Sequence, residues 1–127
     1  MNITRLDHVA ITVKDVATSV EWYAKVLNLK RFEVPQWEGI PVFMVTDTNT
    51  GLAIFPSERG NSDPMPVGKL SHNPHISFSV SHNSFHDAKM ELKEMEIEYV
   101  FQDHAISHSI YFRDPDDYCI EITTYDI

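Results

Sequence analysis

The sequence predicts an α+β fold built from two βαβββ modules, whose strands form a curved, barrel-like mixed sheet with the helices outside. Two observations predict it. Residues 6–13 and residues 74–80 both alternate apolar and polar side chains, as half-buried strands do, and they superpose at an offset of 67 residues with His8 on His75. An amphipathic helical pattern follows each stretch at an offset of 68, so strand and then helix occur twice.

In the first module, the strand at residues 6–13 leads into a helix that Asp15 is expected to cap, because its carboxylate can accept from the first free backbone N–H groups. The apolar stripe of this helix consists of Val16, Val20, Tyr23, Ala24 and Leu27. Short strands are predicted to follow at residues 30–34, 41–46 and 52–55, with a polar turn at residues 47–51.

The second module repeats this order. Ser81 and Asn83 precede a helix whose apolar stripe contains Phe85, Ala88, Leu92 and Met95. Strands are predicted at residues 98–101, 108–113 and 118–124, with an aspartate-rich turn at residues 114–117. We therefore expect a single domain over residues 1–127, with modules at residues 1–56 and 74–127 joined by a linker at 57–73 that is rich in Pro, Gly, Ser and Asn.

The composition excludes several classes of protein. The chain has 127 residues, of which 43% are hydrophobic and 23% are charged, as in a globular domain. Its net charge of −9 argues against nucleic-acid or anionic-membrane partners, which attract positive charge. No apolar run is long enough to span a bilayer, Asp7 and His8 stand where a signal peptide needs an apolar core, and the single cysteine cannot form an intrachain disulfide. We expect a cytoplasmic protein that acts on a small-molecule substrate.

Strand parity selects three candidate metal ligands. If Ile120 and Ile122 pack on the helix, Glu121 points to the opposite face, which forms a concave trough. His8 and His75 occupy the same position of the duplicated strand and face the trough as well. Two imidazoles and one carboxylate suit a divalent transition metal with open coordination positions. A strand histidine is more often a simple hydrogen-bonded residue, but the repeat and a buried carboxylate favour a metal site.

The motifs LDHVAI at 6–11, PHISFSV at 74–80, YFRDPD at 111–116 and IEI at 120–122 resemble the vicinal oxygen chelate superfamily over essentially the whole chain. This superfamily includes glyoxalase I, extradiol dioxygenases, fosfomycin-resistance thiol transferases, methylmalonyl-CoA epimerase and bleomycin-resistance binding proteins. The resemblance implies that His8, His75 and Glu121 are metal ligands. Asp117 stands where the family usually has glycine, and we expect it to keep the turn, because Asp tolerates the left-handed conformation.

The resemblance also bears on the reaction. Glyoxalase-type members carry a fourth ligand, a glutamate, which an offset of 67 places at Ile54; Glu58 is a possible substitute. The three-ligand set matches extradiol dioxygenases and thiol transferases instead. We therefore predict a dioxygenase-like oxidoreductase acting on a small catechol or enediol-type substrate, with Fe²⁺ preferred over Mn²⁺, Zn²⁺ or Ni²⁺. The alternatives are a glyoxalase-like lyase or thiol transferase, and a metal-free protein that binds a small drug-like compound.

Further residues receive roles from the same resemblance. Extradiol dioxygenases have a histidine and then a tyrosine upstream of the ligand glutamate, and Tyr111 and His104 lie near those places. Tyr111 would hydrogen-bond an oxygen at the metal; the alternative is an inward barrel residue whose hydroxyl is satisfied within the protein. His104 would move a proton to or from that oxygen; the alternative is a loop histidine without a role in the reaction. Cys119 has no partner base and is not expected to act as a nucleophile. The family also implies a homodimer, in which modules could be swapped so that His8 comes from a second subunit.

The remaining four histidines are expected to be solvated or capping residues: His72, His82, His86 and His108.

Overall fold

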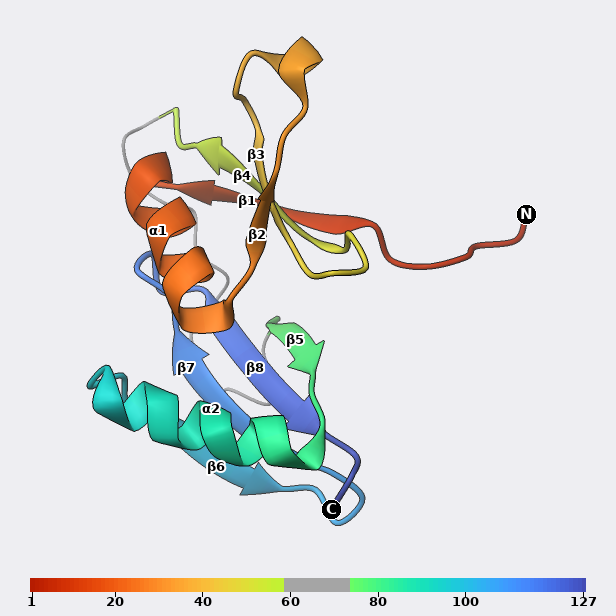
Figure 1. Ribbon diagram of the computed structural model, residues 1–127, viewed down its shortest axis with the longest axis vertical. Helices are drawn as coiled ribbons and strands as arrows, with labels where there is room; N and C mark the ends of the chain where they lie inside the picture. Colours follow the sequence, from red (N-terminus) through yellow and green to blue (C-terminus); the bar gives the residue numbers. More distant parts are fainter. Residues whose placement is uncertain (59–73) are drawn as a thin grey trace. The chain divides into compact units, whose positions relative to one another are not determined.

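The computed structural model describes residues 1–58 and 74–127, which form two compact units (Figure 1). The described part of unit 1 is residues 1–58, and that of unit 2 is residues 74–127. Each has one long helix and one four-stranded sheet. The predicted linker at 57–73 falls almost wholly outside the described residues, and so does His72.

Unit 1 begins with a strand and a helix, as predicted. Its elements are β1 (His8–Val13), α1 (Val16–Leu27), β2 (Lys30–Phe32), the short 3₁₀ helix η1 (Pro35–Trp37), β3 (Val42–Val45) and β4 (Gly51–Pro56). The strand order is β1-β4-β3-β2; β1 runs parallel to β4 and the other neighbours are antiparallel.

Unit 2 has the same topology. Its elements are β5 (Ile76–Ser79), α2 (His82–Glu94), β6 (Val100–Asp103), β7 (His108–Arg113) and β8 (Cys119–Thr124), in the order β5-β8-β7-β6. The parallel pair is again the first and last strand of the unit. The predicted pair of βαβββ modules is therefore confirmed. The described strands form two separate mixed sheets and are not closed into a barrel.

The helices begin at the predicted caps. The Asp15 carboxylate accepts from the Thr18 N–H at 2.8 Å, and the Ser81 hydroxyl accepts from the Ser84 N–H at 3.3 Å. In α2 the buried residues are Phe85 and Leu92, as the predicted stripe requires.

The contact face of α1 is rotated from the predicted stripe. Tyr23 is buried, but Ala24 is exposed and Ser19 is buried instead. Ser19 and Tyr23 are four residues apart and share one face of the helix, so the packing centre lies one residue before the stripe that hydrophobicity alone indicated.

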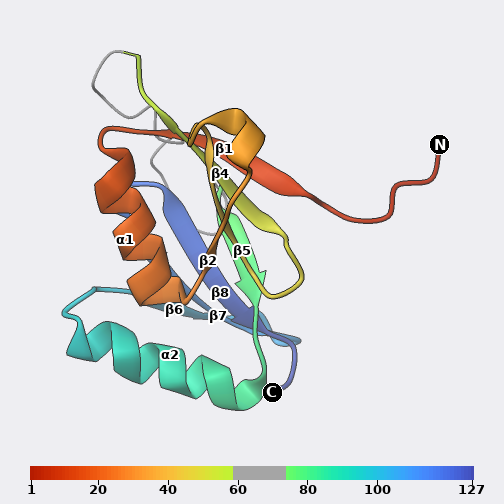
Figure 2. The ribbon, with the colours of Figure 1, turned by 45° about the horizontal axis from the view of Figure 1, so that its top comes forward.

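Each helix covers one face of its own sheet (Figures 1 and 2). The strand residues that alternate onto the helix side are buried and apolar in both units: Ile11, Val13, Val42, Met44, Leu52 and Ile54 in unit 1, and Ile110, Phe112, Ile120 and Ile122 in unit 2. The burial of these side chains leaves the other face of each sheet for polar or ligand-binding residues, as the alternation predicted.

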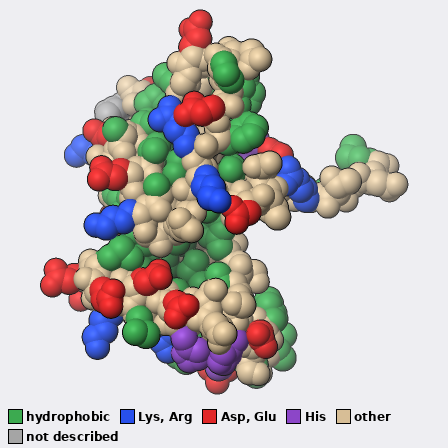
Figure 3. All heavy atoms as spheres, in the orientation of Figure 1, with side chains coloured by type: hydrophobic (Ala, Val, Ile, Leu, Met, Phe, Trp, Pro, Cys, Tyr) green, Lys and Arg blue, Asp and Glu red, His purple; other side chains and the backbone are tan. Residues whose placement is uncertain are grey.

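The outer surface carries much of the acidic charge. Glu91, Glu94, Glu96 and Glu98 are all exposed, and Figure 3 shows acidic side chains gathered over the C-terminal half of α2. Histidine side chains gather at the opposite end of α2, where the exposed His82 and His86 lie with ring centroids 4.7 Å apart. Within residues 1–58 and 74–127, none of the helices has both the length and the apolar character that crossing a bilayer requires.

The turn between β7 and β8 tests the expectation for Asp117. Asp117 has φ +66°, within the left-handed region, and its carbonyl accepts from the Arg113 guanidinium at 2.9 Å. The buried Asp114 carboxylate accepts from the backbone N–H groups of Asp116 and Tyr118, both at 2.8 Å. These bonds hold the turn, so aspartate keeps the conformation that glycine usually provides.

We predict that Asp117→Gly raises the free energy of unfolding by up to about 1 kcal/mol, because glycine has no side-chain penalty at positive φ. Asp117→Val should lower it by about 1–2 kcal/mol, since a β-branched side chain is strained there. Urea unfolding followed by circular dichroism measures both. Equal stability of the two variants would mean that residue 117 does not hold this conformation in solution.

Candidate metal centre

Glu121 lies in the middle of β8, between β5 and β7. Its register partners are Ser77 on the parallel side and Tyr111 on the antiparallel side. The residue is only 7% exposed, although an ionised carboxylate is costly to remove from water without partners. The neighbouring strands must therefore supply those partners.

Both carboxylate oxygens of Glu121 have a partner. The Tyr111 hydroxyl donates to Oε1 at 2.8 Å, and His75 Nε2 lies 3.0 Å from Oε2. Burial by itself raises the pKa of Glu121, but the hydroxyls of Ser109, Ser77 and Tyr111, together with His75, outweigh it and hold the pKa below its usual value. Glu121 is therefore a charged acceptor at neutral pH.

Tyr111 connects this carboxylate to a histidine nearer the solvent. Burial raises the pKa of Tyr111 to about 12, with a further contribution from the hydrogen bond and charge of Glu121. The hydroxyl therefore keeps its proton and donates a hydrogen bond to Glu121. His104 Nε2 lies 3.2 Å from the same hydroxyl oxygen, and since the hydroxyl proton is already directed at Glu121, His104 Nε2–H is the donor in this contact.

These contacts form a continuous series of hydrogen-bonding groups, His75–Glu121–Tyr111–His104. His75 and Tyr111 are also in edge-to-face contact, with ring centroids 5.6 Å apart. Glu121 and Tyr111 are buried, whereas His104 is exposed. The series therefore leads from a buried carboxylate to a group that can exchange protons with water.

His8 lies in unit 1, at the first residue of β1. Its Nδ1 is 2.7 Å from the Asp7 carboxylate, and its ring makes an edge-to-face contact with Phe43 at 5.2 Å. A histidine that binds a metal typically uses one ring nitrogen for the metal and donates the other N–H to a carboxylate or carbonyl. The contact with Asp7 engages Nδ1 and leaves Nε2 as the ring nitrogen that a ligand could use.

The donor atoms of unit 2 fit a transition-metal ion. Two ligands on adjacent positions of one ion, each with a bond of about 2.1 Å, lie about 3 Å apart at an angle near 90°. The 3.0 Å distance from His75 Nε2 to Glu121 Oε2 has this value. Imidazole nitrogen and carboxylate oxygen are also the ligand types that divalent ions such as Fe²⁺, Mn²⁺, Zn²⁺ and Ni²⁺ accept. His75 and Glu121 can therefore hold such an ion.

The structure brings together four of the five predicted site residues: His75, Glu121, Tyr111 and His104. In the described part of the chain, no group of three or more His, Cys, Asp or Glu side chains is gathered in the way a complete metal site requires. The convergence of His8 with His75 and Glu121 stays a prediction. Glu58 is exposed at the end of the described part of unit 1.

The position equivalent to Glu121 in unit 1 is Ala53, and the sequence-based choice of Ile54 was one residue too far. Glu121 pairs with Ser77 in unit 2, and Ala53 pairs in the same way with Ala10, which is the counterpart of Ser77. Ile54 faces the helix side and is fully buried. Since both residues are apolar, a fourth carboxylate ligand is absent from this position either way.

Sequence reasoning assigned no role to three residues that support the site. Asp7 orients His8, and Ser77 and Ser109 help to hold the pKa of Glu121 below its usual value. The two serines could have been found from their place on the predicted inward face. Asp7 could not, because alternation puts neighbouring residues on opposite faces, and only the start of β1 at His8 allows its side chain to reach back.

Cys119 is buried, with 1% exposure, and burial raises the pKa of its thiol. A thiol with a raised pKa is a poor nucleophile at neutral pH. This agrees with the expectation that Cys119 plays no nucleophilic role.

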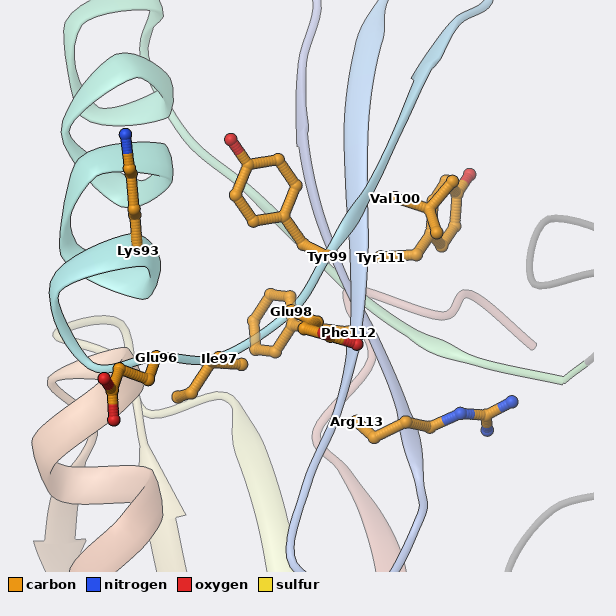
Figure 4. A pocket seen from close by; sticks show the side chains of 9 residues that line it. All are labelled: Lys93, Glu96, Ile97, Glu98, Tyr99, Val100, Tyr111, Phe112 and Arg113. Atoms are coloured by element: carbon orange, nitrogen blue, oxygen red, sulfur yellow. The ribbon is translucent and has the colours of Figure 1, made fainter.

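Unit 2 also has an open cavity of about 940 Å³ beside the C-terminal end of α2 (Figure 4). Figure 4 shows Tyr111 and Arg113 on one side of β7 and Phe112 on the other, as strand alternation requires. The lining of this cavity includes four charged side chains: Lys93, Glu96, Glu98 and Arg113. Neither His75 nor Glu121 lines it, so this cavity is distinct from the carboxylate site, although Tyr111 borders both.

The chain belongs to the Glyoxalase/Bleomycin resistance protein/Dioxygenase superfamily, whose sequence pattern matches residues 5–122. It is 28% identical to the metallothiol transferase FosB of Staphylococcus epidermidis, over 98% of this chain and 84% of that protein. It is 30% identical to Glyoxylase I 4 of Arabidopsis thaliana, over 99% and 74% of the two chains.

A solved structure of a glyoxalase/dioxygenase from Nostoc punctiforme is similar to the whole fold. The two structures superpose with a TM-score of 0.78 and 26% identity, over 97% of this chain and 92% of that one. The arrangement of helices and sheets is therefore that of the superfamily.

We predict that Tyr111→Phe lowers the free energy of unfolding of the metal-free protein by about 1–2 kcal/mol, because it removes a hydrogen bond to a buried charge. Tyr125→Phe, at a tyrosine that is 67% exposed, is the matched control and should change stability by less than about 0.5 kcal/mol. Urea unfolding in the presence of a chelator measures both. Equal effects would show that the Tyr111–Glu121 bond does not stabilise the protein.

Proposed function

We propose that this protein is a metal-dependent enzyme that holds a small substrate through two adjacent oxygens, on one divalent ion bound by His8, His75 and Glu121. The observation that carries the proposal is the series His75–Glu121–Tyr111–His104, which combines a ligand pair with a route for a proton. Two comparisons support the proposal. The chain belongs to this superfamily, and it is similar to a metallothiol transferase.

The assignment of His8 rests on the repeat and on Asp7. His8 stands at the position of His75 in the duplicated strand, and the Asp7 carboxylate leaves its Nε2 for a ligand role. Either the same chain or a second copy would supply it, as a homodimer with swapped modules does.

The bound ion would act as a Lewis acid that stabilises negative charge developing on the substrate oxygens. The protein residues would do the remaining work. Glu121 accepts from Ser77 and Tyr111, which keeps its carboxylate charged and fixed in one orientation. Tyr111 would transfer a proton at a substrate oxygen through its hydroxyl, and His104 would restore it from solvent.

Two reactions fit this arrangement, each favoured by a specific observation. A dioxygenase-like reaction on a catechol or enediol, with Fe²⁺, is favoured by the pairing of Tyr111 with His104 beside the ligand glutamate. Transfer of a thiol to a small electrophile, with Mn²⁺, Zn²⁺ or Ni²⁺, is favoured by the similarity to FosB. The glyoxalase-type reaction is the least favoured of the family's reactions, because Ala53 stands at the place of a fourth carboxylate ligand.

The two reactions are separated by their need for dioxygen. We predict that protein loaded anaerobically with Fe²⁺ consumes oxygen on mixing with a catechol in aerated buffer, measured with an oxygen electrode against 4-methylcatechol and 3,4-dihydroxybenzoate. If thiol transfer is the reaction, protein loaded with Mn²⁺, Zn²⁺ or Ni²⁺ should instead consume a free thiol together with a small epoxide, without oxygen.

In either reaction Tyr111→Phe should lower kcat about a hundredfold or more, as expected when a general acid is lost, whereas Tyr125→Phe should leave it unchanged. Neither oxygen uptake nor thiol consumption with any of the four ions would contradict the proposed enzyme. An unchanged kcat in Tyr111→Phe would contradict the role given to Tyr111.

A further inference from the structure

Unit 1 has its own cavity, of about 420 Å³, on the sheet face that carries His8. The lining residues are His8, Trp37, Ile40, Pro41, Phe43, Ala53 and Phe55. Six of these seven are apolar, and none carries a carboxylate, ammonium or guanidinium group. Small-molecule sites in proteins usually measure about 300–1,000 Å³ and are mostly apolar with a few polar groups, which is the character of this cavity.

Comparison with unit 2 shows that this apolar character is specific to one half of the duplication. Strand register makes Phe43 the counterpart of Tyr111 and Ala53 the counterpart of Glu121. It also makes Pro41 and Phe55 the counterparts of Ser109 and Thr123. In unit 2 these four residues are polar and bonded in pairs, Tyr111 to Glu121 at 2.8 Å and Ser109 to Thr123 at 3.0 Å. In unit 1 all four are apolar.

The helix-facing positions do not differ in this way. Val42, Met44, Leu52 and Ile54 in unit 1 correspond to Ile110, Phe112, Ile120 and Ile122 in unit 2, and all eight are buried and apolar. The requirement for a packed core therefore explains why the helix-facing side of each sheet is apolar. It does not account for the apolar residues at all four of these positions on the other face of unit 1.

The rings in this cavity are arranged around His8. Phe43 lies edge-to-face with His8 at 5.2 Å, and Trp37 lies 5.3 Å from Phe43 at an interplanar angle of 43°. Trp37 and Ile40 are 46% and 59% exposed, on the segment between β2 and β3, so they present apolar surface at the mouth of the cavity. An aromatic ligand can pack against such rings by edge-to-face or offset contacts.

We propose that this cavity binds a flat, uncharged aromatic part of the substrate beside His8, and that Trp37 and Phe43 determine the specificity. The proposal deepens the proposed function and rests on it for the placement of the substrate oxygens near His8. Unit 1 then contributes an apolar wall to substrate binding. A purely polar or cationic substrate would leave this wall without a partner.

The test uses full-length protein in a chelator, so that binding does not depend on a metal. Saturation-transfer NMR measures the binding of benzyl alcohol, which has one neutral aromatic ring, against glycerol and choline as polar and cationic probes. Trp37→Ser removes a wall residue that is half exposed, and Met90→Ser, at a methionine that is 63% exposed on α2, is the matched control. Phe43→Leu tests the second wall residue while keeping an apolar side chain.

We expect benzyl alcohol to bind wild type and Met90→Ser equally, about tenfold more weakly to Trp37→Ser, and more weakly to Phe43→Leu, with no saturable signal from glycerol or choline. Equal binding to all variants, a signal from choline or glycerol as strong as that from benzyl alcohol, or no binding of benzyl alcohol would each overturn the proposal. Loss of a dimer in Trp37→Ser without aromatic binding to wild type would also overturn it, by assigning the cavity to a second copy.

The same experiment separates this proposal from the proposed function. Binding of benzyl alcohol in chelator, by a protein that later takes up no divalent ion, would leave the aromatic site standing and remove the metalloenzyme. A protein that binds an ion at Glu121 but shows no aromatic binding would remove the aromatic site alone.

Discussion

A carboxylate buried in the middle of a β-sheet constrains which side chains the neighbouring strands can place beside it. Glu121 is 7% exposed and charged at neutral pH, and a buried charge without partners would cost several kcal/mol. The strands on both sides therefore carry hydroxyl groups on the same face, and His75 lies against the second carboxylate oxygen. These partners hold the carboxylate in one orientation, so the proposed binding of an ion would need little reorganisation.

The buried carboxylate and its partners belong to one unit of the duplication, and the equivalent positions of the other unit differ from them. Both units share topology, a histidine at the start of the first strand, and an aromatic ring in edge-to-face contact with that histidine. In unit 2 this ring belongs to Tyr111, which bonds to Glu121, and in unit 1 it belongs to Phe43, which lies beside Ala53. One half therefore holds the charge and the proton, and the other offers apolar surface.

Much of this was predictable from the sequence because strand alternation is a strong local constraint. The bounds of β7 were predicted as residues 108–113, and the inward positions of Tyr111 and Glu121 follow from the period of two. The misassignment of Ile54 has the same origin. The repeat gains one residue between its first strand and its helix, and applying the earlier offset to β4 moved the prediction to the opposite face.

Other features depend on information that alternation does not contain. The bond from Asp7 to His8 depends on where β1 begins, and the exposure of Ala24 depends on the angle at which α1 packs. The contact of His104 with Tyr111 joins a turn residue to a strand, so its distance could not be predicted, although the family resemblance indicated its neighbourhood. Convergence of His8 with Glu121 depends on contacts between distant parts of the sequence, which local patterns leave undetermined.

The central claim is that His8, His75 and Glu121 bind one divalent ion. The most direct measurement is the metal content of anaerobically purified protein by mass spectrometry, for wild type, His8→Ala, Glu121→Ala and the control His86→Ala, whose histidine lies exposed on α2. We predict about one ion per chain in wild type and His86→Ala, and at least a tenfold loss in His8→Ala and Glu121→Ala, as expected when a ligand is removed. Equal metal content in all four proteins would contradict the account.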